Sequence, residues 1–105
     1  MDTALIAIWV TAASEEDADA IATALVEQRL AACVTIAPIR SIYRWQGTIE
    51  RSQEWQLTIK TTQARFAAVE AAVQRLHPYD VPEVLAAAIS DSSSTYATWL
   101  VDQVT

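Results

Sequence analysis

The residues best suited to chemistry lie in one segment, residues 77–83, which reads His-Pro-Tyr-Asp-Val-Pro-Glu. His77 is the only histidine of the chain, and an imidazole can bind a metal or transfer a proton. Tyr79, Asp80 and Glu83 are oxygen donors close by in sequence. A structural interpretation is also open, because the proline after His77 ends a helix and a histidine interacts favourably with a helix C-terminus. We predict His77 and Glu83 as metal ligands.

The single cysteine, Cys33, is the third predicted metal ligand. Its thiolate is a soft ligand suited to copper or zinc, although a free cysteine is commonly a small buried apolar residue. With His77 and Met1, one chain offers too few such ligands for a four-ligand Cys/His site. We therefore expect a site shared between subunits or completed by carboxylates. It would bind copper or another divalent cation weakly rather than as a structural metal.

Aromatic residues and one lysine form a third group of candidates. Aromatic residues are more often packing anchors than ligand platforms, but in an oligomer this group could line a cleft between subunits, where the lysine would attract an anionic ligand. The predicted cleft residues are Tyr43, Trp45, Lys60, Tyr79, Tyr96 and Trp99. The sequence has no glycine-rich phosphate loop, no nucleophile elbow and no second histidine. We therefore do not expect an enzyme.

Charge and composition exclude several classes of partner. The 105 residues include 7 Lys and Arg against 13 Asp and Glu, a net charge of −6. This acidic balance argues against binding nucleic acid or an anionic membrane surface. No segment approaches the roughly 20 apolar residues needed to cross a bilayer, and no basic, secretory-type N-terminus is present. We predict a soluble, cytoplasmic protein.

Hydrophobic periodicity predicts the elements that must position these residues. An apolar run indicates a strand, Ser14 is the predicted N-cap of a helix, and two long extended runs flank a Gln46-Gly47 turn. A second helix ends at His77, and a strand, a polar loop and a short helix follow. The predicted strands span 4–11, 32–45, 48–61 and 83–89, and the helices 15–30, 62–76 and 96–100. The order predicts a single α+β domain over 1–105, a ferredoxin-like βαββαβ sandwich with a long hairpin and an extra C-terminal helix.

The hairpin has consequences for assembly. A turn at 46–47 places Tyr43 opposite Glu50, and Pro38 must mark a bulge or an unpaired edge. Trp9 and Trp55 suggest apolar residues on both faces of the sheet. A strand of about 13 residues reaches about 43 Å, far beyond a body with a radius of gyration of about 13 Å. We predict a closed homo-oligomer in which arms add to neighbouring sheets; the alternative is a hairpin bent back on one monomer.

Several of these segments together resemble the CutA divalent-cation-tolerance family over nearly the whole chain. The matching segments are 30–34 (Leu-Ala-Ala-Cys-Val), 41–47 (Ser-Ile-Tyr-Arg-Trp-Gln-Gly), 59–61 (Ile-Lys-Thr) and 77–83, with Tyr96 and Trp99. The resemblance implies a homotrimer of ferredoxin-like subunits with interlocking hairpins, similar in architecture to the PII signalling proteins. It also implies tolerance of copper and other divalent cations, and animal relatives are linked to acetylcholinesterase anchoring.

The resemblance also bears on individual residues. It implies that Cys33 stands where the family commonly has cysteine. The positions that line its intersubunit clefts correspond to Tyr43, Trp45, Lys60, Tyr96 and Trp99. Val10 replaces a first-strand cysteine proposed as a copper ligand in some bacterial members, and Gln46 replaces an acidic residue often found before the turn glycine. The loop before Tyr96 lacks the expected glycine. Two hypotheses stay open, namely weak binding of divalent cations and a PII-like trimer that binds a small anion in its cleft.

Overall fold

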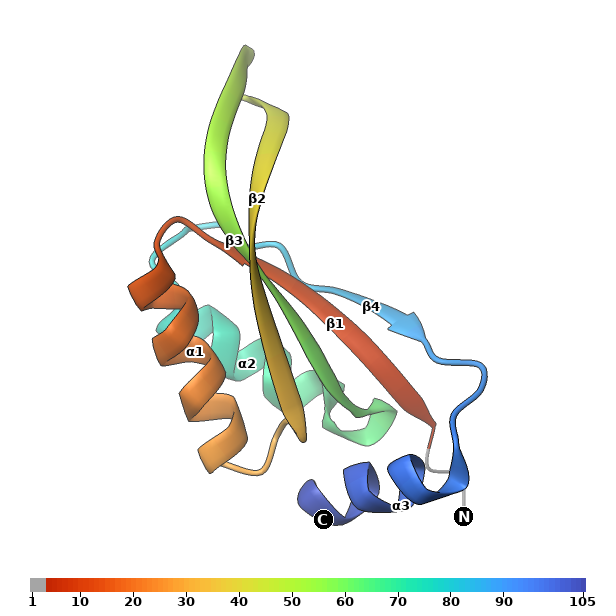
Figure 1. Ribbon diagram of the computed structural model, residues 1–105. Helices are drawn as coiled ribbons and strands as arrows, with labels where there is room; N and C mark the ends of the chain where they lie inside the picture. Colours follow the sequence, from red (N-terminus) through yellow and green to blue (C-terminus); the bar gives the residue numbers. More distant parts are fainter. Residues whose placement is uncertain (1–3) are drawn as a thin grey trace.

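A four-stranded antiparallel sheet carries the fold, and α1 and α2 cover one of its faces (Figure 1). The computed structural model describes residues 4–105; Met1 lies outside the described residues. The strands are ordered β2-β3-β1-β4. The elements are β1 (Leu5–Ala12), α1 (Glu15–Glu27), β2 (Cys33–Trp45), β3 (Thr48–Thr62), a 3₁₀ turn (Gln63–Arg65), α2 (Phe66–Leu76), β4 (Leu85–Ala88) and α3 (Ser94–Gln103). This arrangement confirms the predicted α+β ferredoxin-like fold with its additional C-terminal helix.

The core lies between the sheet and the two helices. Alternate residues of β1 and β3 point into it, and their partners on α1 and α2 recur at helical spacing. Ser14 begins α1 as predicted, because its hydroxyl accepts a hydrogen bond from the Asp17 N–H at 3.0 Å. The largest fully buried core side chains are Ile6, Ile8, Val10, Ile21, Leu25, Leu57, Ile59, Val69 and Val73.

The hairpin between β2 and β3 follows the predicted register. Gln46 and Gly47 have φ angles of 50° and 82°, the pattern of a type I′ turn that matches the twist of the two strands. Tyr43 pairs with Glu50 as expected. Pairing continues without a bulge through Pro38, which lies opposite Trp55. Because β2 is an edge strand, it tolerates a residue without an N–H group, so the edge alternative is the correct one.

Several boundaries differ from the sequence prediction, and α1, for example, ends at Glu27 rather than at residue 30. A 3₁₀ turn separates β3 from α2, so the second helix starts at Phe66 rather than at residue 62. β4 pairs with β1 over only four residues, which limits it to Leu85–Ala88 instead of 83–89. The last helix begins at Ser94, inside the predicted loop, because the Ser93 hydroxyl accepts a hydrogen bond from the Tyr96 N–H at 3.3 Å and caps it.

The sheet face opposite α1 and α2, here called the open face, carries a mixture of polar and apolar side chains. Trp9 lies on it, half-buried, beside Leu85, which is 59% exposed. The prediction that Trp55 marks this second face is wrong. Trp55 pairs with Ala12 and shares its face with Leu57, so it packs against the helix-side core.

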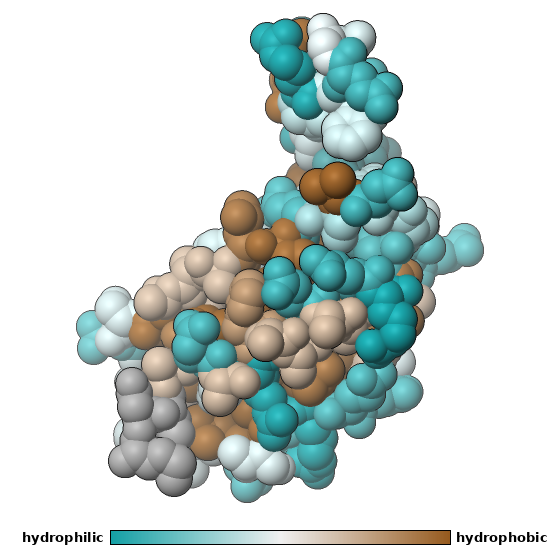
Figure 2. Space-filling model, turned by 180° about the vertical axis from the view of Figure 1, so that it is seen from behind, coloured by the Kyte–Doolittle hydropathy of each residue, from teal (hydrophilic) through white to brown (hydrophobic). Residues whose placement is uncertain are grey.

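The two long strands extend beyond the end of β1 and form an arm, defined here as residues 39–54. The last pair between β1 and β3 joins Ala12 to Trp55, so nothing flanks the hairpin beyond it within the sheet. The molecule is accordingly elongated, with extents of 46 × 25 × 21 Å. Side chains on the arm are mostly hydrophilic with separate hydrophobic ones, whereas the body shows a broad apolar area (Figure 2).

Candidate functional site

His77 holds the 77–83 segment against the end of β1. Its side chain is only 6% exposed, and its backbone N–H closes α2 by donating to the Val73 carbonyl at 2.7 Å. The Tyr79 N–H donates to Nδ1 at 3.1 Å, which leaves the ring proton on Nε2. Nε2–H then donates to the Thr11 carbonyl at 2.7 Å. Both ring nitrogens are therefore engaged, and the segment after α2 is fixed in place.

This segment carries two oxygen donors to the base of the arm. The Tyr79 hydroxyl donates a hydrogen bond to Oε2 of Glu54 at 3.3 Å. Glu54 is buried, at 6% exposure, although it carries a carboxylate. A hollow of about 370 Å³ opens here, and Glu83 lines it together with Glu54 and Tyr79. We call these three residues the arm-base site.

The arm-base site disfavours negative charge. Burial raises the pKa of the Glu83 carboxyl, and the nearby Glu54 carboxylate raises it further. The pKa of the Tyr79 hydroxyl is raised as well, first by burial and then by Glu54. Every cause that shifts the Glu83 pKa acts in the same direction. Two carboxylates held together in this way would gain from a divalent cation between them.

The raised pKa of Glu83 predicts a stability that falls as the pH rises. The folded protein holds the Glu83 proton to a higher pH than the unfolded chain does, so stability is lost as the pH rises from the ordinary value of 4.5 through the folded value. Glu83→Gln should remove this loss, which urea unfolding at pH 4 and pH 7 would measure. Glu70→Gln, on α2 away from the site, is the control. An unchanged pH profile in Glu83→Gln would contradict the assignment.

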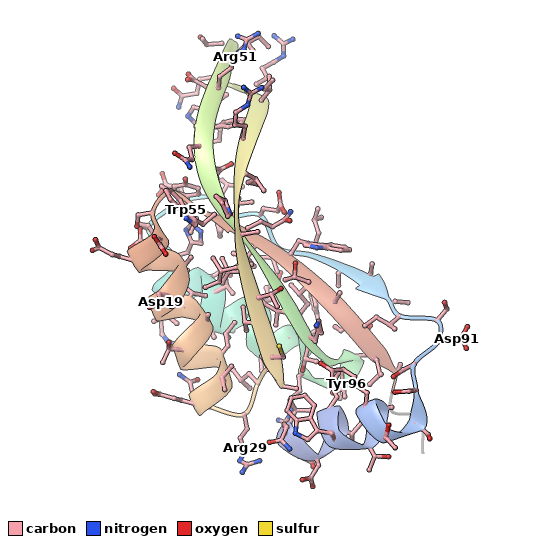
Figure 3. The ribbon with its side chains drawn as sticks, in the orientation of Figure 1. Asp19, Arg29, Arg51, Trp55, Asp91 and Tyr96 are labelled. Carbon is pink, nitrogen blue, oxygen red and sulfur yellow. The ribbon has the colours of Figure 1, made fainter. Side chains whose placement is uncertain are left out.

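A second cluster lies at the opposite end of the sheet, where α3 packs. The Lys60 ammonium lies 5.9 Å from the centre of the Tyr96 ring, and the Tyr96 and Trp99 rings are 5.4 Å apart. Lys60 pairs directly with Cys33, so both occupy the open face. In Figure 3, Tyr96 is labelled on α3 and Arg51 near the far tip of the arm.

The structure thus divides the predicted cleft residues into two groups. Tyr43, Trp45 and Tyr79 line a hollow of about 240 Å³ along the arm, whereas Lys60, Tyr96 and Trp99 belong to the α3 end. The three residues of one group do not meet those of the other within a subunit.

The predicted metal ligands are also divided. Cys33 pairs with Lys60 of β3, whereas His77 is hydrogen-bonded to Thr11, which pairs with Gln56 of β3. Lys60 and Gln56 are four residues apart on the strand, a distance of about 13 Å. Within residues 4–105, no three His, Cys, Asp or Glu side chains come together to hold a metal ion. Besides Glu54 and Glu83, the ligands of a cation at the arm-base site would have to be water, the Tyr79 hydroxyl or groups from another molecule.

Glu54 is the site residue that the sequence analysis missed. A signal was present, because Glu54, Gln56, Thr58 and Lys60 alternate with apolar residues along β3 and mark its open face. The hydroxyl that donates to Glu54 belongs to Tyr79, 25 residues further along the chain, and no local pattern encodes that contact.

Comparison with known proteins identifies the family. A family model described as CutA1 divalent ion tolerance protein matches residues 6–103. The chain belongs to this CutA1 family. The divalent-cation tolerance protein CutA of Thermus thermophilus is 49% identical over 94 residues, which cover 89% of this chain and 91% of the relative. The structure of the periplasmic divalent cation tolerance protein CutA from Archaeoglobus fulgidus matches with a TM-score of 0.95 at 37% identity, covering 96% of this chain and 99% of that one.

CutA1 relatives occur in more than one compartment. Besides the periplasmic Archaeoglobus protein, the chloroplastic protein CutA of Arabidopsis thaliana is 40% identical over 96 residues, which cover 90% of this chain and 53% of the relative. Among the described residues, no helix is both long and apolar enough to cross a membrane.

Proposed function

We propose that this chain is a homotrimeric divalent-cation tolerance protein that binds copper or another divalent cation weakly at the arm-base site. The observation that carries the proposal is the hollow at the base of the arm, which Glu83 lines together with the buried Glu54 and where Glu54 raises the pKa of the Glu83 carboxyl. Two carboxylates that line one hollow without a compensating positive charge attract a divalent cation. The names of the Thermus and Archaeoglobus relatives agree with this chemistry.

Each residue has a distinct role in the proposed binding. Glu83 and Glu54 supply carboxylate oxygens, and the Tyr79 hydroxyl orients Glu54 by donating to it. His77 positions Tyr79 through its Nδ1 bond and contacts the Tyr79 ring, with centroids 4.5 Å apart. As a metal ligand, which the sequence also predicts, His77 would have to give up one of its two hydrogen bonds, so its expected role is to position the segment. The predicted ligand Cys33 would form a separate thiolate site beside Lys60. A site with so few protein ligands exchanges its cation readily.

A trimer explains the surfaces that one subunit leaves open. Both edge strands, β2 and β4, are unpaired on their outer sides within the described chain. The open face carries exposed Leu85 and half-buried Trp9, and such a face is ordinarily covered by a partner. An arm that reaches a neighbour would bring Tyr43 and Trp45 of one subunit toward Tyr96 and Trp99 of another. The predicted cleft would then exist only between subunits.

We further propose a binding role rather than catalysis, and a cytoplasmic location. His77 is the only imidazole of the chain, and both of its nitrogens are already hydrogen-bonded, which leaves no free base of the usual kind near pH 7. The free thiol of Cys33 fits a reducing compartment.

Calorimetric titration of the metal-free protein with Cu²⁺, and separately with Mn²⁺, tests the cation site. The double variant Glu54→Gln and Glu83→Gln should bind either ion at least about tenfold more weakly, because amides carry no charge. Glu70→Gln is the matched control and should bind like the parent. Unchanged affinity in the double variant would contradict the proposal. If Cys33→Ser alone abolished Cu²⁺ binding, the site would be the thiolate instead.

A further inference from the structure

Three aromatic side chains gather around one hollow beside the arm. Tyr43 and Trp45 come from β2, and Tyr79 comes from the segment after α2. The hollow has a volume of about 240 Å³, and Asp80 and Val81 complete its lining. The three aromatic residues are 37–48% exposed, and exposed apolar side chains that gather in this way mark interaction sites. We call this feature the aromatic hollow.

Contacts inside the subunit hold two of the three rings in place. The Ser52 hydroxyl donates a hydrogen bond to the Tyr43 hydroxyl at 3.4 Å. The Tyr79 ring lies against the His77 ring, with centroids 4.5 Å apart, and its hydroxyl donates to Glu54 at 3.3 Å. The walls of the aromatic hollow are therefore positioned before any ligand enters, which lowers the cost of binding.

The aromatic hollow carries negative charge. Asp80 lines it, and Glu50 pairs with Tyr43 across the hairpin. Directly paired residues share a face of the sheet, so the Glu50 carboxylate stands beside the Tyr43 ring. Burial, and then the Glu54 carboxylate, raise the pKa of the Tyr79 hydroxyl, which agrees with a negative potential at this ring. Among the described residues that line the hollow, none is basic.

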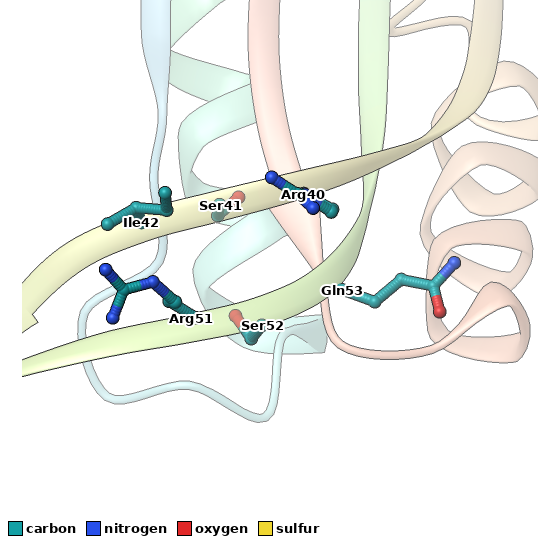
Figure 4. Close-up of a pocket in the computed structure, with 6 residues that line it drawn as sticks. All are labelled: Arg40, Ser41, Ile42, Arg51, Ser52 and Gln53. Atoms are coloured by element: carbon teal, nitrogen blue, oxygen red, sulfur yellow. The ribbon is translucent and has the colours of Figure 1, made fainter.

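The basic residues of the arm lie on its other face. Side chains alternate along a strand, so Arg40 and Arg44 point away from the face of Tyr43. Arg51 pairs with Ile42 and shares their face. Figure 4 shows Arg40 and Arg51 around a separate hollow of about 500 Å³. The arginines of the hairpin are therefore not placed to neutralise the carboxylates of the aromatic hollow.

This combination of rings and negative charge selects among ligand classes. An anion would be repelled, because the lysine of the predicted cleft belongs to the α3 end of the sheet. A divalent metal ion requires several oxygen or nitrogen ligands, which aromatic rings do not supply. A primary ammonium is strongly hydrated. A quaternary ammonium group donates no hydrogen bond, and its charge is attracted to the faces of Trp and Tyr rings.

We propose that the aromatic hollow binds a quaternary ammonium group. Trp45 supplies the ring type that attracts a cation most strongly, and Tyr43 and Tyr79 complete the walls. The Asp80 carboxylate balances the charge, while Val81 offers an apolar surface to the methyl groups. A volume of about 240 Å³ is below the roughly 300–1,000 Å³ of sites for drug-sized ligands. The hollow therefore suits a compact headgroup.

The aromatic hollow is distinct from the arm-base site, although both contain Tyr79. Glu54 and Glu83 line the arm-base hollow and do not line the aromatic one. The inference therefore does not rest on the proposed binding of divalent cations. Two cations at neighbouring sites repel each other. A divalent cation at the arm-base site should weaken ammonium binding, and the ammonium group should weaken cation binding by the same factor.

NMR titration of the metal-free protein with tetramethylammonium tests the inference. The N-methyl resonance should move to high field as the group enters between the rings. tert-Butanol is similar in size but carries no charge, and it should bind at least about tenfold more weakly. Equal affinities for the two probes would overturn the inference, because the hollow would then select for size alone. Absence of any shift with tetramethylammonium would overturn it as well.

Variants of the lining residues locate the binding. Trp45→Leu should weaken tetramethylammonium binding about tenfold, whereas Trp45→Phe keeps a ring and should retain part of the affinity. Asp80→Asn should also weaken it, while the matched control Asp91→Asn, in the exposed loop before α3, should not. Unchanged affinity in both Trp45→Leu and Asp80→Asn would overturn the assignment. Sedimentation verifies that each variant associates like the parent.

A second pair of probes identifies the source of the group. One is a peptide that carries trimethyl-lysine, and the other is the same peptide with unmodified lysine. Tighter binding of the trimethylated peptide than of tetramethylammonium would place the group on a protein, and equal or weaker binding would place it on a small compound. Both results support recognition of the group. Tetramethylammonium binding without any Cu²⁺ binding would contradict the proposed function and leave this inference standing.

Discussion

Replacing Ile8 with alanine is expected to lower the free energy of unfolding by about 3 kcal/mol, the middle of the range for truncating a buried isoleucine. Ile8 is fully buried at the centre of β1. It lies between Ile59 of β3 and Ala86 of β4, so it joins three strands on the helix-covered face. The substitution removes apolar contacts on both sides and leaves a cavity that the flanking strands cannot close.

Urea unfolding at one fixed protomer concentration measures this effect, because assembly contributes to apparent stability. Val81→Ala is the matched control, since Val81 is 71% exposed in the segment before β4. That substitution should change stability by less than about 0.5 kcal/mol. A loss in Ile8→Ala no larger than in the control would show that the core does not lie between β1 and the helices.

The core around Ile8 could be predicted because the pattern that encodes it is local. The near-continuous apolar run of β1 and the helical spacing of Ile21 and Leu25 place the covered face correctly. The single glycine fixes the hairpin turn, because Gly47 adopts a positive φ that other residues disfavour. From that turn the register of the whole arm follows, residue by residue.

Boundaries set by tertiary contacts could not be predicted in this way. The apolar stretch around β4 is longer than the part of β1 that pairs with it, so its length depends on a neighbour and not on its own residues. Trp55 was misplaced because its position between Leu57 and the charged Glu54 suggested an apolar residue on the second face of the sheet, whereas its pairing with Ala12 places it on the core side.

Only part of the candidate site could be predicted from the sequence, because the rest of it also depends on tertiary contacts. Glu83 and Tyr79 stand in one conspicuous segment, but Glu54 joins them from the arm only after folding. The partner of His77 is a backbone carbonyl, that of Thr11, and every residue has one, so no residue type could have marked it. A histidine suited to binding a metal thus turns out to be engaged in structural hydrogen bonds.

His77→Ala is expected to lower the free energy of unfolding by about 2–4 kcal/mol, because it removes a buried ring and leaves two backbone groups without partners. These groups are the Thr11 carbonyl and the Tyr79 N–H. The exposed neighbour Arg75→Ala is the control and should be close to neutral. His77→Gln should recover part of the loss, since its amide can still donate a hydrogen bond toward Thr11.

The same variants distinguish a structural histidine from a metal ligand. If His77 positions the segment, then His77→Gln should retain most of the Cu²⁺ affinity that the Glu54→Gln and Glu83→Gln double variant loses. A ligand would give the reverse pattern, with affinity lost in His77→Gln and stability close to that of the parent. Because Nε2 and Nδ1 are each hydrogen-bonded to the backbone, binding a metal through either nitrogen would break a buried bond. The resulting cost is what makes the structural role the stronger expectation.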